Sequence, residues 1–171
     1  MRLILIFLSV FSLQIIGQDY NQKKVDEERG DTLLVGYCTR EAFEDHLFSE
    51  WFAEEYDFYS PVFENQELLQ TLLDDIEITI VMGTWCSDSK MQVPAFYRIL
   101  DELKYNTKRI TLISVDREKQ SPGNLTNDLD IELVPTFILY KDNEELGRII
   151  EIPNETLEKD IFKIISKVKG N

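Results

Sequence analysis

The sequence has few of the side chains that most often bind metals or form structural crosslinks. It contains two cysteines, Cys38 and Cys86, and one histidine, His46. No cysteine or second histidine lies beside His46 at the spacing of metal ligands, so we expect no metal site. No motif in the chain indicates an organic cofactor, and we expect none.

Positive charge is also scarce. The chain has 18 lysines and arginines against 32 aspartates and glutamates, which gives a formal net charge of -14. Such a surface repels a phosphate backbone, and this excludes a general nucleic-acid binder. Residues 41–89 carry thirteen acidic side chains and no lysine or arginine. We interpret this stretch as a solvated face, with a site for basic partners as the alternative.

Long apolar runs are absent except at the start of the sequence. Arg2 precedes an apolar segment, 3–16, that is too short to span a bilayer comfortably. A positive charge followed by such a segment is typical of a signal peptide, which we assign to residues 1–17 with cleavage near Gly17. We therefore expect an exported protein, periplasmic or secreted, with no membrane attachment after cleavage. An uncleaved membrane anchor is the alternative.

The middle of the chain divides into two predicted segments before the main domain. Residues 18–38 are expected to be a solvated linker, because 19–31 lack apolar periodicity. Residues 39–64 are expected to be a helical, aromatic-rich extension. Its apolar residues recur at steps of four, which predicts a helix face that packs against the main domain; they include Phe43, Leu47 and Trp51.

The remaining residues, 65–171, are expected to form one α/β domain. Apolar spacing and β-branched residues predict helices and strands in the order βαβ and then ββα, after a short leading helix. The predicted ranges are 65–75, 76–82, 88–104 and 109–115, a hairpin of 136–140 with 146–150, and a helix that Asn154 caps and that runs to Lys169. No internal repeat interrupts this order.

The two cysteines lie in different surroundings. Cys86 stands where a buried strand gives way to a helix, so the helix dipole and unpaired backbone N–H groups stabilise its thiolate. Asp88 opposes that effect, and the sign of the sum stays open at this point. Cys38 lies in an earlier segment. We expect an inert thiol there, with a disulfide to Cys86 or to another chain as the alternative.

The sequence around Cys86 resembles that of a known family. Trp85-Cys-Ser-Asp-Ser-Lys-Met-Gln-Val-Pro94 is similar to the thioredoxin signature Trp-Cys-x-x-Cys-Lys-Met-x-x-Pro, and Val134-Pro-Thr136 resembles the family's Ile/Val-Pro-Thr. The resemblance implies an α/β thioredoxin fold, a central mixed sheet flanked by helices, here with an N-terminal helical extension. It also implies a cis peptide bond at Pro135. The segment 51–59 resembles the front extension of exported thioredoxin-like proteins common in Bacteroidetes.

Two departures from the family pattern bear on activity. Ser89 occupies the position of the resolving cysteine, so the motif is Cys-x-x-Ser, and Ile80 replaces the family's buried aspartate. In the family's cycle the second cysteine expels the product from a mixed disulfide. Serine does not form disulfides, so an external small-molecule or protein thiol has to complete the release.

The resemblance therefore implies monothiol thiol–disulfide exchange, with Cys86 as the nucleophile. Ser89 is expected to hydrogen-bond the thiolate. The substrate groove is expected at Trp85 and at the Val134, Pro135 and Thr136 segment. The implied partners are protein thiols and disulfides, or extended peptides. The alternative is a thioredoxin-like module that binds peptides by backbone pairing and performs no redox step.

Overall fold

The computed structural model describes residues 19–167. The predicted signal peptide at residues 1–17 and the last residues of the helix predicted to reach Lys169 lie outside the described residues. Within 19–167, no helix is both long enough and apolar enough to cross a membrane.

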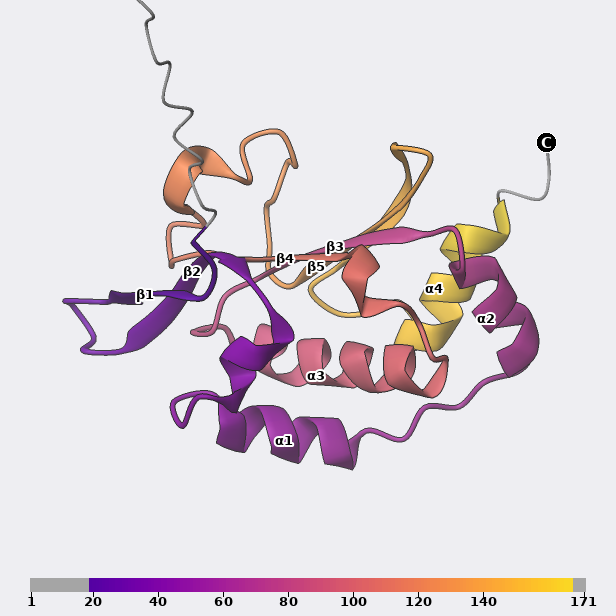
Figure 1. The fold of residues 1–171 in the computed structure, drawn as a ribbon, viewed down its shortest axis with the longest axis horizontal. Helices are drawn as coiled ribbons and strands as arrows, with labels where there is room; N and C mark the ends of the chain where they lie inside the picture. The colour runs from indigo at the N-terminus through magenta and orange to yellow at the C-terminus, as the bar shows by residue number, and fades with distance from the viewer. Residues whose placement is uncertain (1–18, 168–171) are drawn as a thin grey trace, which may run out of the picture.

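A six-stranded mixed sheet forms the centre of the molecule, with the strand order β1-β2-β4-β3-β5-β6 (Figure 1). β3 and β4 are parallel neighbours, and every other neighbouring pair is antiparallel. The strands are β1 Gln22–Val25, β2 Thr32–Cys38, β3 Glu77–Met82, β4 Ile110–Ser114, β5 Thr136–Lys141 and β6 Glu144–Ile150.

Helices cover the sheet in layers. In Figure 1, α3 lies beneath the sheet and α1 lies beneath α3, while α2 and α4 stand together at the right. The segment between β4 and β5 rises on the opposite side of the sheet. The helices are α1 Ser49–Phe58, α2 Gln66–Leu73, α3 Ser87–Glu102 and α4 Leu157–Ser166, with short 3-10 turns η1 Arg40–Glu44, η2 Thr107–Arg109 and η3 Pro122–Asn124.

Alternation along the central strands divides the core into two clusters. In β3, Ile80 and Met82 join a large cluster that includes residues from all four helices. Val81 points the other way, as successive side chains of a strand must, and joins a small cluster with Ile113 and Val134. Trp85 and Cys86 pack against this second cluster, which places them at the end of β3 on that side.

The predicted linker at 18–38 is wrong, because this segment supplies two strands. β2 carries buried Leu33, Leu34 and Val35 and pairs with β4, where Gly36 lies opposite Ser114. β1 is an edge strand with three of its four residues exposed, so its side chains lack an apolar alternation. β1 is a strand because it pairs with β2, and the local sequence pattern does not reveal that pairing.

The extension at 39–64 is helical but interrupted. A 3-10 turn, η1, ends at Glu44, and the α-helix α1 begins at Ser49. Asp45 separates them, since its backbone is extended and its carboxylate accepts the Leu47 N–H at 3.0 Å. Such a local side-chain bond competes with helix formation.

The last helix begins later than predicted. Thr156 caps α4, and its hydroxyl accepts the Lys159 N–H at 3.3 Å. Asn154 instead donates its backbone N–H to the Asp160 carboxylate at 2.6 Å. Both Asn and Thr are good capping residues, so the sequence alone does not choose between them.

Candidate active site

Cys86 is the N-cap residue of α3, directly after the turn that follows β3. Its backbone N–H donates to Gly83 O at 3.0 Å, which closes that turn. The side chain is half-buried, and the thiol donates to the backbone oxygen of Val134 at 3.1 Å. The sulfur therefore lies at the start of a helix and against the loop before β5, two segments that are far apart in the sequence.

Ser89 lies one helical turn further on, and it is fully buried. Its hydroxyl oxygen accepts the backbone N–H of Gly83 at 3.2 Å. The hydrogen bond expected between Ser89 and the sulfur of Cys86 is not found among the described residues. Ser89 therefore holds the turn before the cysteine, and the thiol hydrogen-bonds Val134 instead.

Ile80 is completely buried in β3, opposite Leu112 of β4 and Phe137 of β5. The place of the family's buried carboxylate thus belongs to the apolar core. A charged group there would be desolvated at considerable cost. No general base at position 80 is available to a second thiol.

The loop before β5 forms the other side of the site. The Val134–Pro135 peptide bond is cis. Thr136 is 1% exposed, and its hydroxyl donates to Leu133 O at 2.7 Å. The side chains of Val134 and Thr136 therefore support the loop from inside. The backbone carbonyl of Val134 faces the Cys86 thiol, and that of Pro135 accepts the Glu151 N–H at 2.7 Å.

Trp85 is fixed on several sides. Its indole N–H donates to Val115 O at 3.0 Å. The guanidinium of Arg117 lies 5.5 Å from the centroid of its ring. A Cβ on Gly83 would lie 2.5 Å from the indole nitrogen, so the ring packs closely onto a position that has no side chain.

The β1–β2 hairpin holds Arg117 in place. Arg117 donates to Asp26 at 2.6 Å and to Asp31 at 2.8 Å, and these two aspartates lie at the two ends of the hairpin turn. Lys24 of β1 binds Asp116 at 2.8 Å. We call this group of ion pairs the hairpin clamp. The clamp is not predictable from sequence, because residues 19–31 lack the apolar periodicity of a hairpin and the paired residues lie far apart in the chain.

Cys38 has no part in this site. It is buried at the end of β2, with its thiol 3.6 Å from Gly36 O. Burial raises the pKa of the Cys38 thiol to about 12. Cys38 and Cys86 are both free thiols. Residues 19–167 hold no group of three or more histidine, cysteine or acidic side chains that could bind a metal ion.

The part of the chain that carries this site is similar to known proteins. Residues 62–166 match the family model described as Thioredoxin. Thioredoxin from Mus musculus is 28% identical over 96 residues, which cover 56% of this chain and 86% of the mouse protein. Chloroplastic thioredoxin Y1 from Arabidopsis thaliana is 35% identical over 66 residues, which cover 39% of this chain and 36% of that protein.

Among solved structures, mitochondrial thioredoxin 3 from Saccharomyces cerevisiae aligns with 64% of this chain and 98% of its own. The identity is 23% and the TM-score is 0.39. The chain spans about a third of the length of thioredoxin Y1 and most of the length of the mouse protein.

Proposed function

This chain belongs to the thioredoxin family, and from that premise we propose that it performs monothiol thiol–disulfide exchange through Cys86 on exported proteins. The observation that carries the proposal is the position of the Cys86 sulfur. It is half-exposed at the start of α3, 3.1 Å from the backbone of Val134. A thiol at a helix N-terminus is the arrangement that stabilises a thiolate for attack.

The exchange proceeds in two successive thiol–disulfide exchange steps. The Cys86 thiolate attacks one sulfur of a substrate disulfide, so that a mixed disulfide forms, the substrate S–S bond breaks, and the other substrate sulfur leaves as a thiolate. An external thiolate then attacks the substrate sulfur of the mixed disulfide and releases Cys86 as a thiolate. Cys86 ends as it began, and the external thiol stays joined to the substrate.

An external thiol is needed because of what surrounds Cys86. Ser89 occupies the place one turn along the helix and is bonded to Gly83. Ile80 provides no carboxylate. A mixed disulfide on Cys86 is therefore expected to persist until a small-molecule or protein thiol reaches it. An extended peptide is the proposed substrate segment, placed against the exposed residues Glu132 and Leu133 of the loop before β5, since residues 134–136 are buried.

Trapping the mixed disulfide tests the proposal. The Cys38→Ala variant, in which Cys86 is the sole thiol, is mixed with a peptide disulfide at neutral pH and its intact mass is measured. We expect one peptide to add and reduced glutathione to remove it. The matched control, Cys38→Ala with Cys86→Ser, should gain no mass.

The alternative is a peptide-binding module without redox chemistry. Two departures from the dithiol pattern favour it as the second candidate: Ser89 in place of the resolving cysteine and Ile80 in place of the buried aspartate. If Cys86 forms no adduct and reacts with iodoacetamide as slowly as a buried thiol does, the exchange proposal is wrong and the binding module replaces it.

Export is proposed from the pattern of Arg2 and residues 3–16. Intact-mass measurement of protein recovered from its native host tests it, with a chain lacking about the first 17 residues as the expected result. A full-length chain found in the cytoplasm would contradict it.

A further inference from the structure

We propose that a second site, separate from Cys86, binds a small aromatic molecule that carries one carboxylate. The site is a cavity of about 530 Å³ at the point where β2 ends and η1 begins. Its volume lies within the usual range for small-molecule pockets. None of Trp85, Cys86 or the residues of the Pro135 loop lines it, so the two sites do not overlap. We call it the tyrosine pocket.

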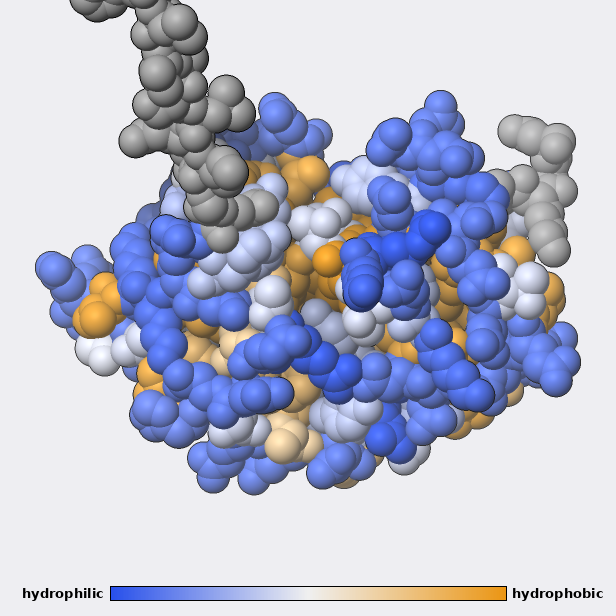
Figure 2. Space-filling view, in the orientation of Figure 1, coloured by the Kyte–Doolittle hydropathy of each residue, from blue (hydrophilic) through white to orange (hydrophobic). Residues whose placement is uncertain are grey.

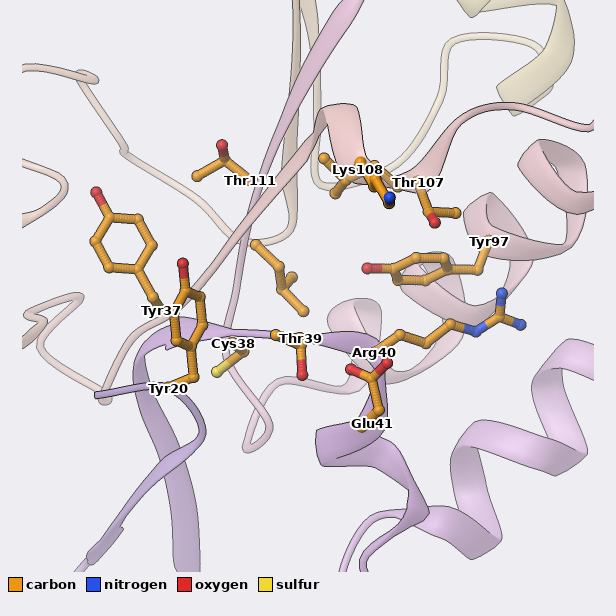
Figure 3. A pocket seen from close by; sticks show the side chains of 12 residues that line it. Tyr20, Tyr37, Cys38, Thr39, Arg40, Glu41, Tyr97, Thr107, Lys108 and Thr111 are labelled. Atoms are coloured by element: carbon orange, nitrogen blue, oxygen red, sulfur yellow. The ribbon is translucent and has the colours of Figure 1, made fainter. Parts of the chain in front are cut away.

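The tyrosine pocket combines residues from segments far apart in the sequence. Tyr20 and Tyr37 come from the β1–β2 region, Tyr97 comes from α3, and Lys108 comes from η2 (Figure 3). Ile110 and Leu112 of β4 supply apolar lining, because β2 ends opposite Leu112 and leaves the rest of β4 uncovered on that side. In Figure 2, hydrophobic residues show between polar ones near the middle of the molecule.

Tyr97 is the first indication of a ligand. It is 2% exposed, yet its hydroxyl forms no hydrogen bond with any residue in 19–167. Figure 3 shows this hydroxyl directed toward the middle of the lining side chains. Burial raises the pKa of Tyr97, so the group stays protonated and offers a donor. The hydroxyl faces the cavity that Tyr97 lines, where a ligand oxygen would accept a hydrogen bond from it.

Charge on the pocket favours an anion bound beside Lys108. The Lys108 ammonium is exposed and has no ion-pair partner within the described part of the chain. Arg40, the other cation of the lining, is already bound to Asp101 at 2.8 Å. Glu41 adds a negative charge, and its hydrogen bond with Thr39 lowers the pKa of its carboxyl. One free cation and one fixed anion suit a monocarboxylate better than a dianion.

The aromatic lining indicates a planar ring in the rest of the ligand. The rings of Tyr20 and Tyr37 lie 6.2 Å apart with an angle of 45° between their planes. Aromatic groups pack favourably in offset or tilted arrangements at such separations. A ring against these tyrosines and the β4 side chains would place its carboxylate toward Lys108 and the Tyr97 hydroxyl.

Titration of the full-chain protein with 2-naphthoate, followed by backbone amide NMR shifts, tests the proposal. We expect saturable shifts at residues of the tyrosine pocket. Tyr97→Phe and Lys108→Met should each weaken binding about tenfold, since each removes one hydrogen bond to a charged group. The uncharged analogue 2-naphthamide should bind more weakly than 2-naphthoate and should be insensitive to Lys108→Met.

Two controls separate this site from the rest of the molecule. Lys104→Met removes an exposed lysine four residues before Lys108 that does not line the pocket, and it should leave the affinity unchanged. Cys86→Ser should also bind 2-naphthoate normally, so failure of the exchange chemistry and failure of this site are distinguishable. The proposal is overturned if wild type shows no saturable shifts with millimolar 2-naphthoate, if the shifts lie elsewhere, or if neither pocket variant weakens binding.

Discussion

At position 89, a buried hydroxyl oxygen accepts the Gly83 N–H and so supports the turn that carries Cys86. A thiol there would stand one helical turn from the Cys86 sulfur, and residues three apart on a helix are neighbours. Cα atoms three residues apart in a helix are about 5 Å from each other, which a disulfide can bridge. Ser89 therefore determines whether the mixed disulfide can be resolved from within the chain.

Ser89→Cys is expected to form an internal disulfide with Cys86 and to reduce a protein disulfide faster than wild type when supplied with dithiol reductant. The gain should be partial, because Ile80 supplies no base to deprotonate the second thiol. Loss of the hydrogen bond to Gly83 should lower the free energy of unfolding by about 1 kcal/mol. Peptide mapping without reductant and a disulfide-reduction assay measure the two effects.

Ile80→Asp added to Ser89→Cys should raise the rate again while lowering stability, since it buries a carboxylate in the core. Ile80→Asp alone is the matched control, and it should lower stability without adding reductase activity. A Ser89→Cys variant with no internal disulfide and an unchanged rate would contradict the expected geometry.

The buried thiol of Cys38 predicts how the stability of the fold depends on pH. Its thiol is neutral in the folded state up to about pH 12, whereas in the unfolded chain it ionises near the ordinary cysteine pKa of about 8.5. The unfolded state therefore releases this proton first as pH rises. The stability contributed by the raised pKa is present in full below the unfolded pKa and is lost as pH rises toward the folded one.

We accordingly expect the melting temperature of wild type to fall above about pH 9 and that of Cys38→Ala to fall less steeply. Burial also raises the pKa values of Tyr59, Tyr97 and Tyr105. These tyrosines are present in both proteins, so the difference between the two curves isolates Cys38. Parallel curves would show that Cys38 does not ionise on unfolding as expected. At neutral pH, iodoacetamide should modify Cys86 in the folded protein and leave Cys38 intact.

Among structural elements, the β1–β2 hairpin shows what a local pattern misses. The central elements were predictable because each is long and apolar on a defined face: the strand at 76–82, the helix that starts after Cys86, and the hairpin near 136–150. Their bounds differ from the structure by a few residues. β1 has no such apolar face, and it becomes a strand through its pairing with β2. The thioredoxin fold with its mixed central sheet is confirmed by the family match and the strand order.

The candidate site was predictable to a similar degree. The motif located Cys86 and the loop at Pro135, and the structure brings them together. The predicted hydrogen bond from Ser89 to the Cys86 thiolate is wrong. The Ser89 hydroxyl accepts from Gly83 instead, and this depends on how the turn at Gly83 folds. The ion pairs of Arg117 join residues some 90 positions apart, and no spacing rule links such positions.

Arg117→Met is expected to loosen the hairpin clamp and expose Trp85 to solvent. In a Trp51→Phe background, acrylamide should quench the fluorescence of Trp85 more strongly than in the parent protein. Arg29→Met is the matched control, because this hairpin arginine has no ion pair among the residues described. Equal quenching of Arg117→Met and the parent would show that the indole is held by Val115 alone.

The clamp should also weaken in acid. The hydrogen bond from Arg117 lowers the pKa of Asp26, so its contribution is present above the unfolded pKa near 3.8 and is lost as pH falls through the folded value. Quenching of Trp85 should therefore rise below about pH 4 in the parent protein and change less in Arg117→Met, where the pair is already absent.

For the whole molecule, the extension before residue 62 shares the core with the matched domain. Phe52 of α1 stacks on Phe43 at 4.5 Å and contacts the ring of Tyr97 at 6.0 Å. It is 8% exposed and belongs to the large cluster. The predicted packing of the extension against the main domain is thus seen in the structure, although the helix begins later than expected.

Phe52→Ala is expected to lower the free energy of unfolding by about 3–5 kcal/mol, as large-to-small changes at buried aromatic positions do. Unfolding should remain a single transition, since α1 and α3 share one core. Chemical denaturation followed by near- and far-UV circular dichroism measures both. Phe58→Ala, at an exposed position of the same helix, is the control and should change stability little. Two separate transitions would contradict a shared core.

The pairing of β2 with β4 also determines when the molecule can finish folding. A chain is synthesised from its N-terminus, so the apolar Leu33-Leu34-Val35 segment emerges long before Ser114, which lies opposite Gly36 in the finished sheet. During that interval β2 has one neighbour, the polar strand β1, and its other edge is open to pairing with foreign chains. β4 covers this edge when it inserts between β2 and β3, so the first two strands join the sheet only after two thirds of the chain has been made, and β5 and β6 complete the other side.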